Sequence, residues 1–436
     1  MPLIEGTHIT ASYQGKPVAG LVIQVQDGNV TIKLDTGYNI IVPESELSDA
    51  RPDASKQPAS APKPHIKQDS ALPKVTILHT GGTIASKVDY TTGAVTNRFT
   101  PEDLIAMFPE MAAIANISSQ LLRNMASDDM RFAHYNIMAR AVLEEISKAD
   151  PAKGIIITHG TDTLHYTAAA LSFALEGVNI PVVLVGAQRS SDRGSSDAAS
   201  NLMAAARFIT QAKAPGVFVA MHEKSDDDSI AIISGLHARK NHSSRRDAFV
   251  SVNAPLVARV KDGHVEIIDA ARIERLRAAA QDKPRVLAFK EDLKVGLWKA
   301  HTQAYSDELL VYDHYDGLVI EGTGLGHIPM NETDEFTAEH ERIRQRVEQL
   351  AKRIPVAIAT QTIFGRVNLN VYRPQRILKG MGVLGDGCDM TAEVAFIKLA
   401  WLLSNFSKEE TRAQYGVDLR GEISTRSPLE DSHNPG

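Results

Sequence analysis

The segment Val75-Thr76-Ile77-Leu78-His79-Thr80-Gly81-Gly82-Thr83 joins a short apolar run to a turn of glycine and threonine. The run is apolar and rich in β-branched residues, which is typical of a strand that is buried on both faces. Glycine allows the backbone of a tight turn, so we expect the strand to end at about His79. Polar side chains directly after such a strand lie at the edge of the sheet where ligands bind. The segment therefore predicts an α/β fold with a polar site at the end of its first strand.

The same pattern recurs along the chain and predicts doubly wound parallel sheets covered by helices on both faces. Further short apolar runs lie at residues 154–157, 182–185 and 216–221, and an amphipathic helix is expected at 135–148. After a charged stretch at 278–292 the alternation repeats on a smaller scale. Its expected strands are 295–298, 317–320 and 356–359, and its expected helices are 337–353 and 391–403. We expect two α/β domains, at 74–280 and 281–420, and then a polar, mobile tail at 421–436.

The first 73 residues have a different character. Short strands are expected at 9–13, 19–26, 30–34 and 38–42, separated by glycine-containing turns. They predict a small β-barrel domain at residues 1–50. Residues 51–73 are rich in Pro, Ala, Ser, Lys and Gln and have few apolar anchors, so they predict a linker.

The bulk composition limits the class of protein. A chain of 436 residues is too long for one ordinary core, and its 43% hydrophobic and 23% charged residues are those of a soluble globular protein. The net charge of -6 argues against a globally basic nucleic-acid surface. Cys388 is the single cysteine, which excludes an internal disulfide and a thiolate zinc cluster. With neither a signal-like start nor a long apolar run, we expect a soluble cytoplasmic protein.

A second polar turn, Thr158-His159-Gly160-Thr161-Asp162-Thr163, also follows an expected strand. Taken singly, either threonine turn is more often structural than catalytic. A phosphate-binding loop needs a lysine directly before Ser or Thr, whereas Lys87 follows Ser86. Glu321-Gly322-Thr323-Gly324-Leu325-Gly326 lacks the glycine spacing of a dinucleotide fingerprint, so we expect a tight turn at a strand end.

In combination these segments resemble the L-asparaginase family of amidohydrolases. Thr80-Gly81-Gly82-Thr83-Ile84-Ala85 matches the first family signature, and His159-Gly160-Thr161-Asp162-Thr163 matches the second. The other matching segments are Ser127-Asp128-Asp129-Met130, Val185-Gly186-Ala187-Gln188-Arg189 and Ala238-Arg239-Lys240. The resemblance runs from about residue 74 to 404.

The resemblance implies hydrolysis of a small side-chain carboxamide, with Thr83 as the nucleophile. It places Tyr90 on a lid over the site and makes Thr161, Asp162 and Lys240 a second, triad-like group. A lysine can act as a base only when neutral, and burial favours the neutral amine whereas a neighbouring carboxylate favours the charged one. This reasoning does not decide which hydroxyl attacks first, so Thr161 remains the competing nucleophile.

The resemblance also assigns the substrate's α-carboxylate and α-amino group to the region of Ser127 and Asp128. This sequence departs from the family there, because the asparaginase with the closest form of the motif carries glutamine where this chain has Asp128. Without the family match, Lys240 would be interpreted as one more surface cation, and a solvated loop before a helix would be the alternative interpretation of Ser127 and Asp128. The choice between glutamine and asparagine as substrate therefore stays open.

The barrel and linker distinguish this chain from an ordinary asparaginase, which begins near the first α/β strand. Together with the segments 321–327 and 365–372, they resemble the glutaminase subunits of tRNA-dependent amidotransferases. This resemblance implies that the chain hydrolyses glutamine to glutamate and ammonia and passes the ammonia to a partner, the E subunit of the amidotransferase. That partner would use ATP and magnesium to convert Glu-tRNA(Gln) to Gln-tRNA(Gln), so no metal or cofactor is expected in this chain. A homodimer within a heterotetramer is expected.

Two alternatives stay open. A free-standing L-asparaginase would be fully active without partner or tRNA. A non-catalytic scaffold on the same fold would keep the function of its complex when Thr83 is replaced by alanine.

Overall fold

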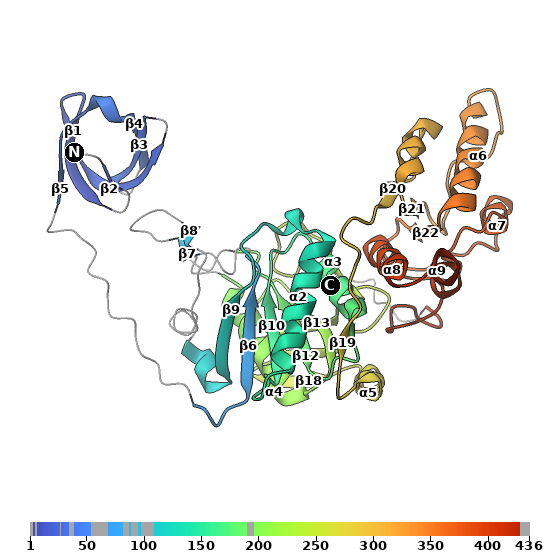
Figure 1. The fold of residues 1–436 in the computed structure, drawn as a ribbon, viewed down its shortest axis with the longest axis horizontal. Helices are drawn as coiled ribbons and strands as arrows, with labels where there is room; N and C mark the ends of the chain where they lie inside the picture. Colours follow the sequence, from blue (N-terminus) through green and yellow to red (C-terminus); the bar gives the residue numbers. More distant parts are fainter. Residues whose placement is uncertain are drawn as a thin grey trace.

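The structure is a computed structural model that describes residues 3–4, 7–26, 28–34, 39–53, 69–81, 87–88, 95–96, 109–189 and 196–427. Figure 1 shows a small β unit in blue, a large α/β unit in cyan to yellow, and a smaller α/β unit in orange to red. This order confirms the expected fold class. Within the described ranges no helix combines the length and the apolar character needed to cross a bilayer.

The N-terminal unit is a five-stranded antiparallel sheet in the order β4-β3-β2-β1-β5. Its strands are β1 (His8–Tyr13), β2 (Lys16–Gln26), β3 (Asn29–Leu34), β4 (Asn39–Pro43) and β5 (Leu47–Pro52). The first four confirm the expected strands. β5 was not expected, and it reaches two residues into the predicted linker. Only Leu47 and Ala50 of this strand are partly buried, so its sequence lacks the alternation that marks a half-buried strand.

The large α/β unit contains an eight-stranded sheet in the order β18-β17-β14-β13-β12-β10-β6-β9. The strands, in chain order, are β6 (Lys74–His79), β9 (Asn116–Leu121), β10 (Gly154–Thr158), β12 (Pro181–Val185), β13 (Gly216–His222), β14 (Ser229–Ser234), β17 (Ala258–Lys261) and β18 (His264–Ile267). The first five are parallel, as expected. β14, β17 and β18 were not predicted, and they pair antiparallel with their neighbours, so the sheet is mixed. The connections from β13 to β14 and from β17 to β18 are too short for a crossover helix.

Helices cover both faces of this sheet. α2 (Phe132–Ile146) and α3 (Leu164–Ala174) pack in one core, and α4 (Ala198–Ala212) packs in the other. Ile155 and Ile157 of β10 belong to the first core and Ile156 to the second, because side chains alternate along a strand.

The remaining described elements are shorter or peripheral. They are η1 (Glu44–Glu46), β7 (Lys87–Val88), β8 (Val95–Thr96), η4 (Pro109–Ala113), η5 (Ser127–Asp129), β11 (Leu175–Glu176), β15 (Ala238–Lys240), β16 (Phe249–Ser251), α5 (Ala270–Ala279) and β19 (Arg285–Val286). Of these, η5 and β15 carry predicted site residues.

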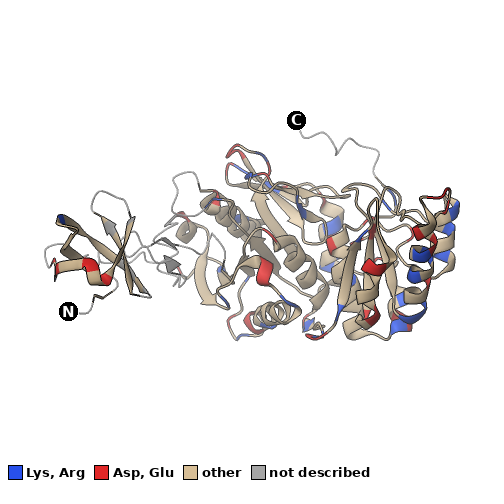
Figure 2. Cartoon of the chain, turned by 90° about the horizontal axis from the view of Figure 1, so that it is seen from above, with Lys and Arg blue, Asp and Glu red and all other residues tan. Residues whose placement is uncertain are grey.

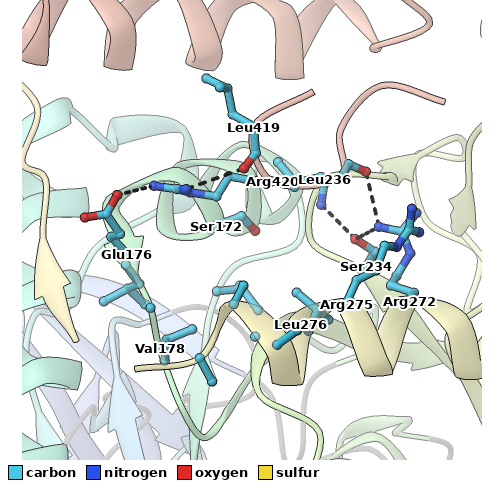
Figure 3. Close-up of a pocket in the computed structure, with 18 of the residues that line it drawn as sticks. Ser172, Glu176, Val178, Ser234, Leu236, Arg272, Arg275, Leu276, Leu419 and Arg420 are labelled. Atoms are coloured by element: carbon cyan, nitrogen blue, oxygen red, sulfur yellow. Dashed lines mark hydrogen bonds and ion pairs between the residues drawn. The ribbon is translucent and has the colours of Figure 1, made fainter. Parts of the chain in front are cut away.

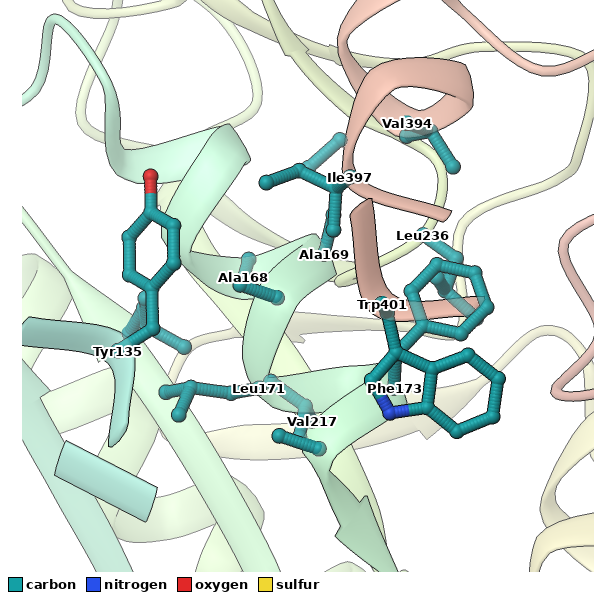
Figure 4. Packing of buried hydrophobic residues seen from close by; sticks show 14 of the residues in the cluster. Tyr135, Ala168, Ala169, Leu171, Phe173, Val217, Leu236, Val394, Ile397 and Trp401 are labelled. Carbon is teal, nitrogen blue, oxygen red and sulfur yellow. The ribbon is translucent and has the colours of Figure 1, made fainter. Parts of the chain in front are cut away.

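The smaller unit has a parallel sheet in the order β20-β21-β22, as expected. Its elements are β20 (Val295–Lys299), η6 (Ser306–His314), β21 (Gly317–Gly322), α6 (Ala338–Arg353), β22 (Val356–Thr360), α7 (Arg373–Gly380), α8 (Ala392–Asn405) and α9 (Lys408–Gln414). α8 belongs to the same core as α3, and the rings of Phe173 and Trp401 stack with centroids 5.4 Å apart (Figure 4). The two α/β units therefore meet in one of the hydrophobic cores, while each also has a core of its own.

Residues 421–427 are the described part of the expected polar tail, and Glu422 among them is buried. The Glu422 carboxylate lies 2.5 Å from Lys398 Nζ of α8, and neither side chain is exposed to solvent. Glu422 also accepts hydrogen bonds from the backbone N–H groups of Leu419 and Arg420. A polar composition suggested a solvated tail, but a buried ion pair holds this segment against the smaller unit.

Candidate active site

The two polar turns lie side by side, because β6 and β10 are neighbours in the sheet. Thr80 donates hydrogen bonds from its backbone N–H and from its hydroxyl to the carbonyl of Thr158, at 3.2 and 2.9 Å. Gly81 has φ +112°, and a Cβ there would lie 2.4 Å from the Met125 carbonyl oxygen. This turn therefore requires glycine. Thr83 and Tyr90 lie outside the described residues, so their placement stays a prediction.

The second turn contacts the predicted lysine. Lys240 lies at the end of β15, in a hairpin with β16, and its Nζ donates to Thr161 Oγ1 at 2.8 Å. The same amine lies 2.7 Å from Asp162 Oδ1. The Lys240 side chain is 9% exposed and that of Asp162 is 71% exposed, so the amine is enclosed while the carboxylate faces solvent. The structure thus brings together the three members of the predicted triad-like group.

Ser127 packs directly against this turn. A Cβ on Gly160 would lie 2.9 Å from both Cβ and Oγ of Ser127, and the Thr163 hydroxyl donates to the Ser127 carbonyl. Ser127 is buried, whereas the neighbouring Asp128 is exposed and forms no hydrogen bond or ion pair with any residue that the structure describes. Ser127 is therefore a buried part of the site, and the Asp128 carboxylate is exposed where a ligand can reach it.

Gln188 is a site residue that the sequence prediction did not include. It follows β12, the next strand after β10, and its Oε1 accepts a hydrogen bond from Thr161 Oγ1 at 3.4 Å. Its backbone N–H donates to both carboxylate oxygens of Asp197, each at 3.0 Å. Gln188 Nε2 is enclosed without a partner among the described residues. The available signal was its place directly after a buried strand, beside the two recognised turns.

The histidines of the two turns are structural. Burial lowers the pKa of His159 to about 4, although its bond to the Gly160 carbonyl opposes this shift. His159 Nδ1 lies 2.7 Å from that carbonyl, and its Nε2 lies 2.9 Å from the Thr167 hydroxyl. Burial likewise lowers the pKa of His79 to about 4. Both rings are neutral at pH 7, and they hold the ends of β6 and β10 in place.

The glycine-rich stretch after β21 forms a tight turn, as expected. Thr323 N–H donates to the His327 carbonyl at 2.8 Å, and the two residues form a β-bridge. The chain therefore reverses its direction directly after β21. Within the described ranges, no group of three His, Cys, Asp or Glu side chains is arranged to hold a metal ion.

A cavity of about 500 Å³ lies elsewhere, between the end of α3, α5 and residues 418–421 (Figure 3). Arg420 pairs there with Glu176 at 3.0 Å, and the guanidinium of Arg272 lies 3.4 Å from Ser234 Oγ. None of the predicted site residues lines it. This cavity is therefore separate from the predicted site.

Comparisons with known proteins identify the family. Residues 74–272 match the family model "Asparaginase, N-terminal", and residues 294–415 match "Glutaminase/Asparaginase C-terminal domain". Among curated relatives, the D subunit of the glutamyl-tRNA(Gln) amidotransferase of Archaeoglobus fulgidus is 40% identical over 96% of this chain and 95% of its own. The corresponding D subunit of Methanococcus maripaludis is 38% identical over 98% of this chain and 99% of its own.

Among solved structures, L-asparaginases are similar to most of this chain. The thermostable L-asparaginase from Thermococcus kodakarensis is similar with a TM-score of 0.69 and 30% identity, over 81% of this chain and 100% of that one. L-asparaginase I from Vibrio cholerae has a TM-score of 0.66 and 25% identity, over 81% and 99%. The chain belongs to the asparaginase family and, within it, to the glutamyl-tRNA(Gln) amidotransferase D subunits.

Proposed function

We propose that this chain is the glutaminase subunit of a tRNA-dependent amidotransferase. The length of the similarity supports this proposal over that of a simple asparaginase. The asparaginase from Thermococcus kodakarensis aligns over its full length with only 81% of this chain, whereas the D subunit of Archaeoglobus fulgidus aligns with 96%. The N-terminal unit is therefore shared with the D subunits and absent from the asparaginase.

The contact between Lys240 Nζ and Thr161 Oγ1 is the observation that carries the proposed chemistry. A threonine hydroxyl is a weak nucleophile until a neighbouring base takes its proton. Lys240 in its neutral form can accept that proton at 2.8 Å, and Asp162 orients the amine from 2.7 Å. The enclosed amine can thus exchange a proton with the threonine turn.

In the proposed reaction the hydroxyl oxygen of Thr83 attacks the side-chain amide carbon of glutamine, and the hydroxyl proton passes to the proposed base, Lys240. The C–N bond then breaks, and the nitrogen leaves as ammonia with the proton that the base has taken. Water hydrolyses the resulting threonine ester and releases glutamate. Backbone N–H groups of the glycine-rich turn and of the turn at Thr161 would stabilise the oxyanion of each tetrahedral intermediate.

Thr161 is the competing first nucleophile. Its hydroxyl is the one that contacts Lys240 in the described part of the chain, and it donates a hydrogen bond to Gln188 Oε1 at 3.4 Å. If Thr161 attacks first, Thr83 acts in the second half of the reaction. The amide hydrolysis is the same in both orders.

Substrate binding is assigned to residues around the turn. Ser127 and Asp128 would bind the α-carboxylate and α-amino group, and Tyr90 would close over the substrate. The exposed Asp128 carboxylate, which has no partner among the described residues, suits an ammonium group.

The ammonia would pass to the E subunit of the amidotransferase, which would use ATP and magnesium to amidate glutamate on tRNA(Gln).

The surface charge supports a partner that holds most of the tRNA. The chain has a net charge of -6, and Figure 2 shows basic residues mixed with acidic ones. On α6 the basic side chains pair with acids, as Arg342–Glu339, Arg344–Glu341, Arg346–Asp313, Lys352–Glu348 and Arg353–Asp313. We propose a cytoplasmic heterotetramer that contains a homodimer of this chain.

The test is amidation of Glu-tRNA(Gln) by the complex, with glutamine or with free ammonia as the nitrogen donor. Thr83→Ala and Lys240→Ala should abolish the glutamine-dependent reaction and spare the ammonia-dependent one. Loss of both reactions would contradict the proposed role, and retention of both would favour a scaffold.

A free-standing asparaginase is the second candidate, favoured by the similarity to two L-asparaginases over 81% of the chain. Ammonia release from asparagine and from glutamine by the pure chain separates the two functions. Fast hydrolysis of asparagine without partner or tRNA would support the second candidate.

A further inference from the structure

An ion pair joins the smaller α/β unit to the strand that carries Lys240. Arg239 precedes Lys240 on β15, and Glu393 lies in the first turn of α8. Arg239 Nε lies 3.2 Å from Glu393 Oε1, and its Nη2 lies 3.1 Å from the same oxygen. The Glu393 side chain is 12% exposed, so this carboxylate is held inside the protein. The smaller unit thus places a carboxylate against Arg239, the residue that precedes the proposed base in the sequence.

His165 connects this ion pair to the threonine turn. It lies in the first turn of α3, three residues after Asp162, and its Nε2 lies 3.9 Å from Glu393 Oε1. Burial lowers the pKa of His165 to about 4; Glu393 opposes this shift, and Arg239, Lys240 and His159 add to it. The ring is therefore neutral at pH 7. Because the charges of both Arg239 and Lys240 act on this ring, the two cations share one electrostatic environment.

Glu393 is the anion that balances this environment. Burial by itself would raise the pKa of the Glu393 carboxyl, but Arg239 and His165 bring it below its ordinary value, so the carboxylate is charged at pH 7. Burial raises the pKa of the neighbouring Tyr166 to about 12, with Glu393 and Glu321 adding to the shift and Arg239 opposing it. Asp162 faces Lys240, and Glu393 faces Arg239. The other titratable groups of this cluster are His165, the groups His159 and Tyr166 that act on or pack against its ring, and Glu321, which acts on Tyr166.

We propose that Glu393 is a positioning residue that, by holding Arg239 and cancelling its charge, sets the electrostatic environment in which Lys240 accepts and returns a proton. This inference rests on the proposed function, in which Lys240 is the base. An arginine keeps its charge at every accessible pH. Charges in a partly enclosed site are screened weakly, so an unbalanced guanidinium next to Lys240 would favour the neutral amine. An unbalanced Glu393 would favour the protonated amine.

The test is the pH dependence of kcat for glutamine hydrolysis by the full chain in complex with its partner and charged tRNA. The variants are Glu393→Gln, Arg239→Gln, the double variant, and Arg239→Lys as the charge-conserving control. Glu393→Gln should move the acidic limb of the profile by about one pH unit toward acid, and Arg239→Gln should move it by about one unit toward alkali. The double variant and Arg239→Lys should return the limb to within a few tenths of a unit of the wild type.

Thermal melting of the same variants separates this role from a structural one. If the profiles superimpose on the wild type while the melting temperature falls, the pair only joins the two units and the proposal is overturned. A uniform loss of activity that the double variant fails to restore also overturns it. Failure of the proposed function has a different signature, which is wild-type hydrolysis by Lys240→Ala. The double variant and Arg239→Lys keep the comparison possible should one single variant fail to fold.

Discussion

Lys240 Nζ lies 2.8 Å from Thr161 Oγ1, although 79 positions separate the two residues in the chain. The hairpin of β15 and β16 presents the lysine, and the turn after β10 presents the threonine. The proposed active site is therefore built from two elements of the large α/β unit that are far apart in the sequence. Each element can be tested on its own.

Replacing Lys240 by Met should lower kcat for glutamine hydrolysis by roughly 10²- to 10⁴-fold, because it removes the proposed general base. Thr161→Val should give a loss of similar order, whereas Thr161→Ser keeps the hydroxyl and most of the activity. Lys261→Met, at an exposed lysine of β17, is the matched control and should leave kcat unchanged. Steady-state ammonia release measures all four. A loss smaller than tenfold in Lys240→Met would exclude this amine as the base.

Gly160→Ala should destabilise the chain by about 1–3 kcal/mol and impair hydrolysis, because the new Cβ would lie 2.9 Å from Ser127 Cβ. Adding Ser127→Ala to Gly160→Ala should not relieve this clash, since alanine keeps that Cβ. Gly380→Ala is the control, because a Cβ there meets no atom within 4 Å. Urea unfolding of the three variants gives the comparison. Equal stability of Gly160→Ala and Gly380→Ala would show that Ser127 does not pack against Gly160 as described.

The chain should lose stability in acid between pH 6.5 and about 4. Burial holds the pKa of His79, His159 and His165 near 4, against 6.5 for an ordinary histidine. Because the folded-state pKa is depressed, each contribution is fully present above pH 6.5 and is lost as the pH falls through 4, by up to roughly 3 kcal/mol per residue. His159→Gln should reduce the difference in unfolding free energy between pH 7 and pH 5 by roughly 2 kcal/mol. The exposed His264→Gln should not change that difference, and an unchanged difference in both variants would contradict the prediction.

Glu422→Ala should lower the free energy of unfolding by about 3–5 kcal/mol, because it leaves the fully buried Lys398 ammonium without its carboxylate. Glu409→Ala, at an exposed glutamate of α9, should change it by less than about 0.5 kcal/mol. Chemical denaturation of both variants at pH 7 is the measurement. A small effect of Glu422→Ala would mean that the segment after Gly421 does not hold the smaller unit.

Local patterns determined which elements form. β6, β10 and β12 were predictable because short β-branched runs have no other stable place than a buried strand, and α8 because Thr391 caps its start by accepting from Val394 N–H. The glycine turn after β6 was predictable for a similar reason, since Gly81 adopts a backbone conformation that other residues rarely adopt.

Tertiary structure decided what distant parts of the chain do to one another. β5 pairs with β1 without an apolar pattern of its own, and the polar residue Glu422 is buried because Lys398 meets it there. β14 also pairs antiparallel with β17, although the segment that contains β15 and β16 separates the two strands in the chain. Sequence motifs alone named Thr161, Asp162 and Lys240, since a chemical role needs particular side chains. The contact of Gln188 with Thr161 and that of Glu393 with Arg239 could be found only from the fold. A contact between side chains depends on the position of each backbone.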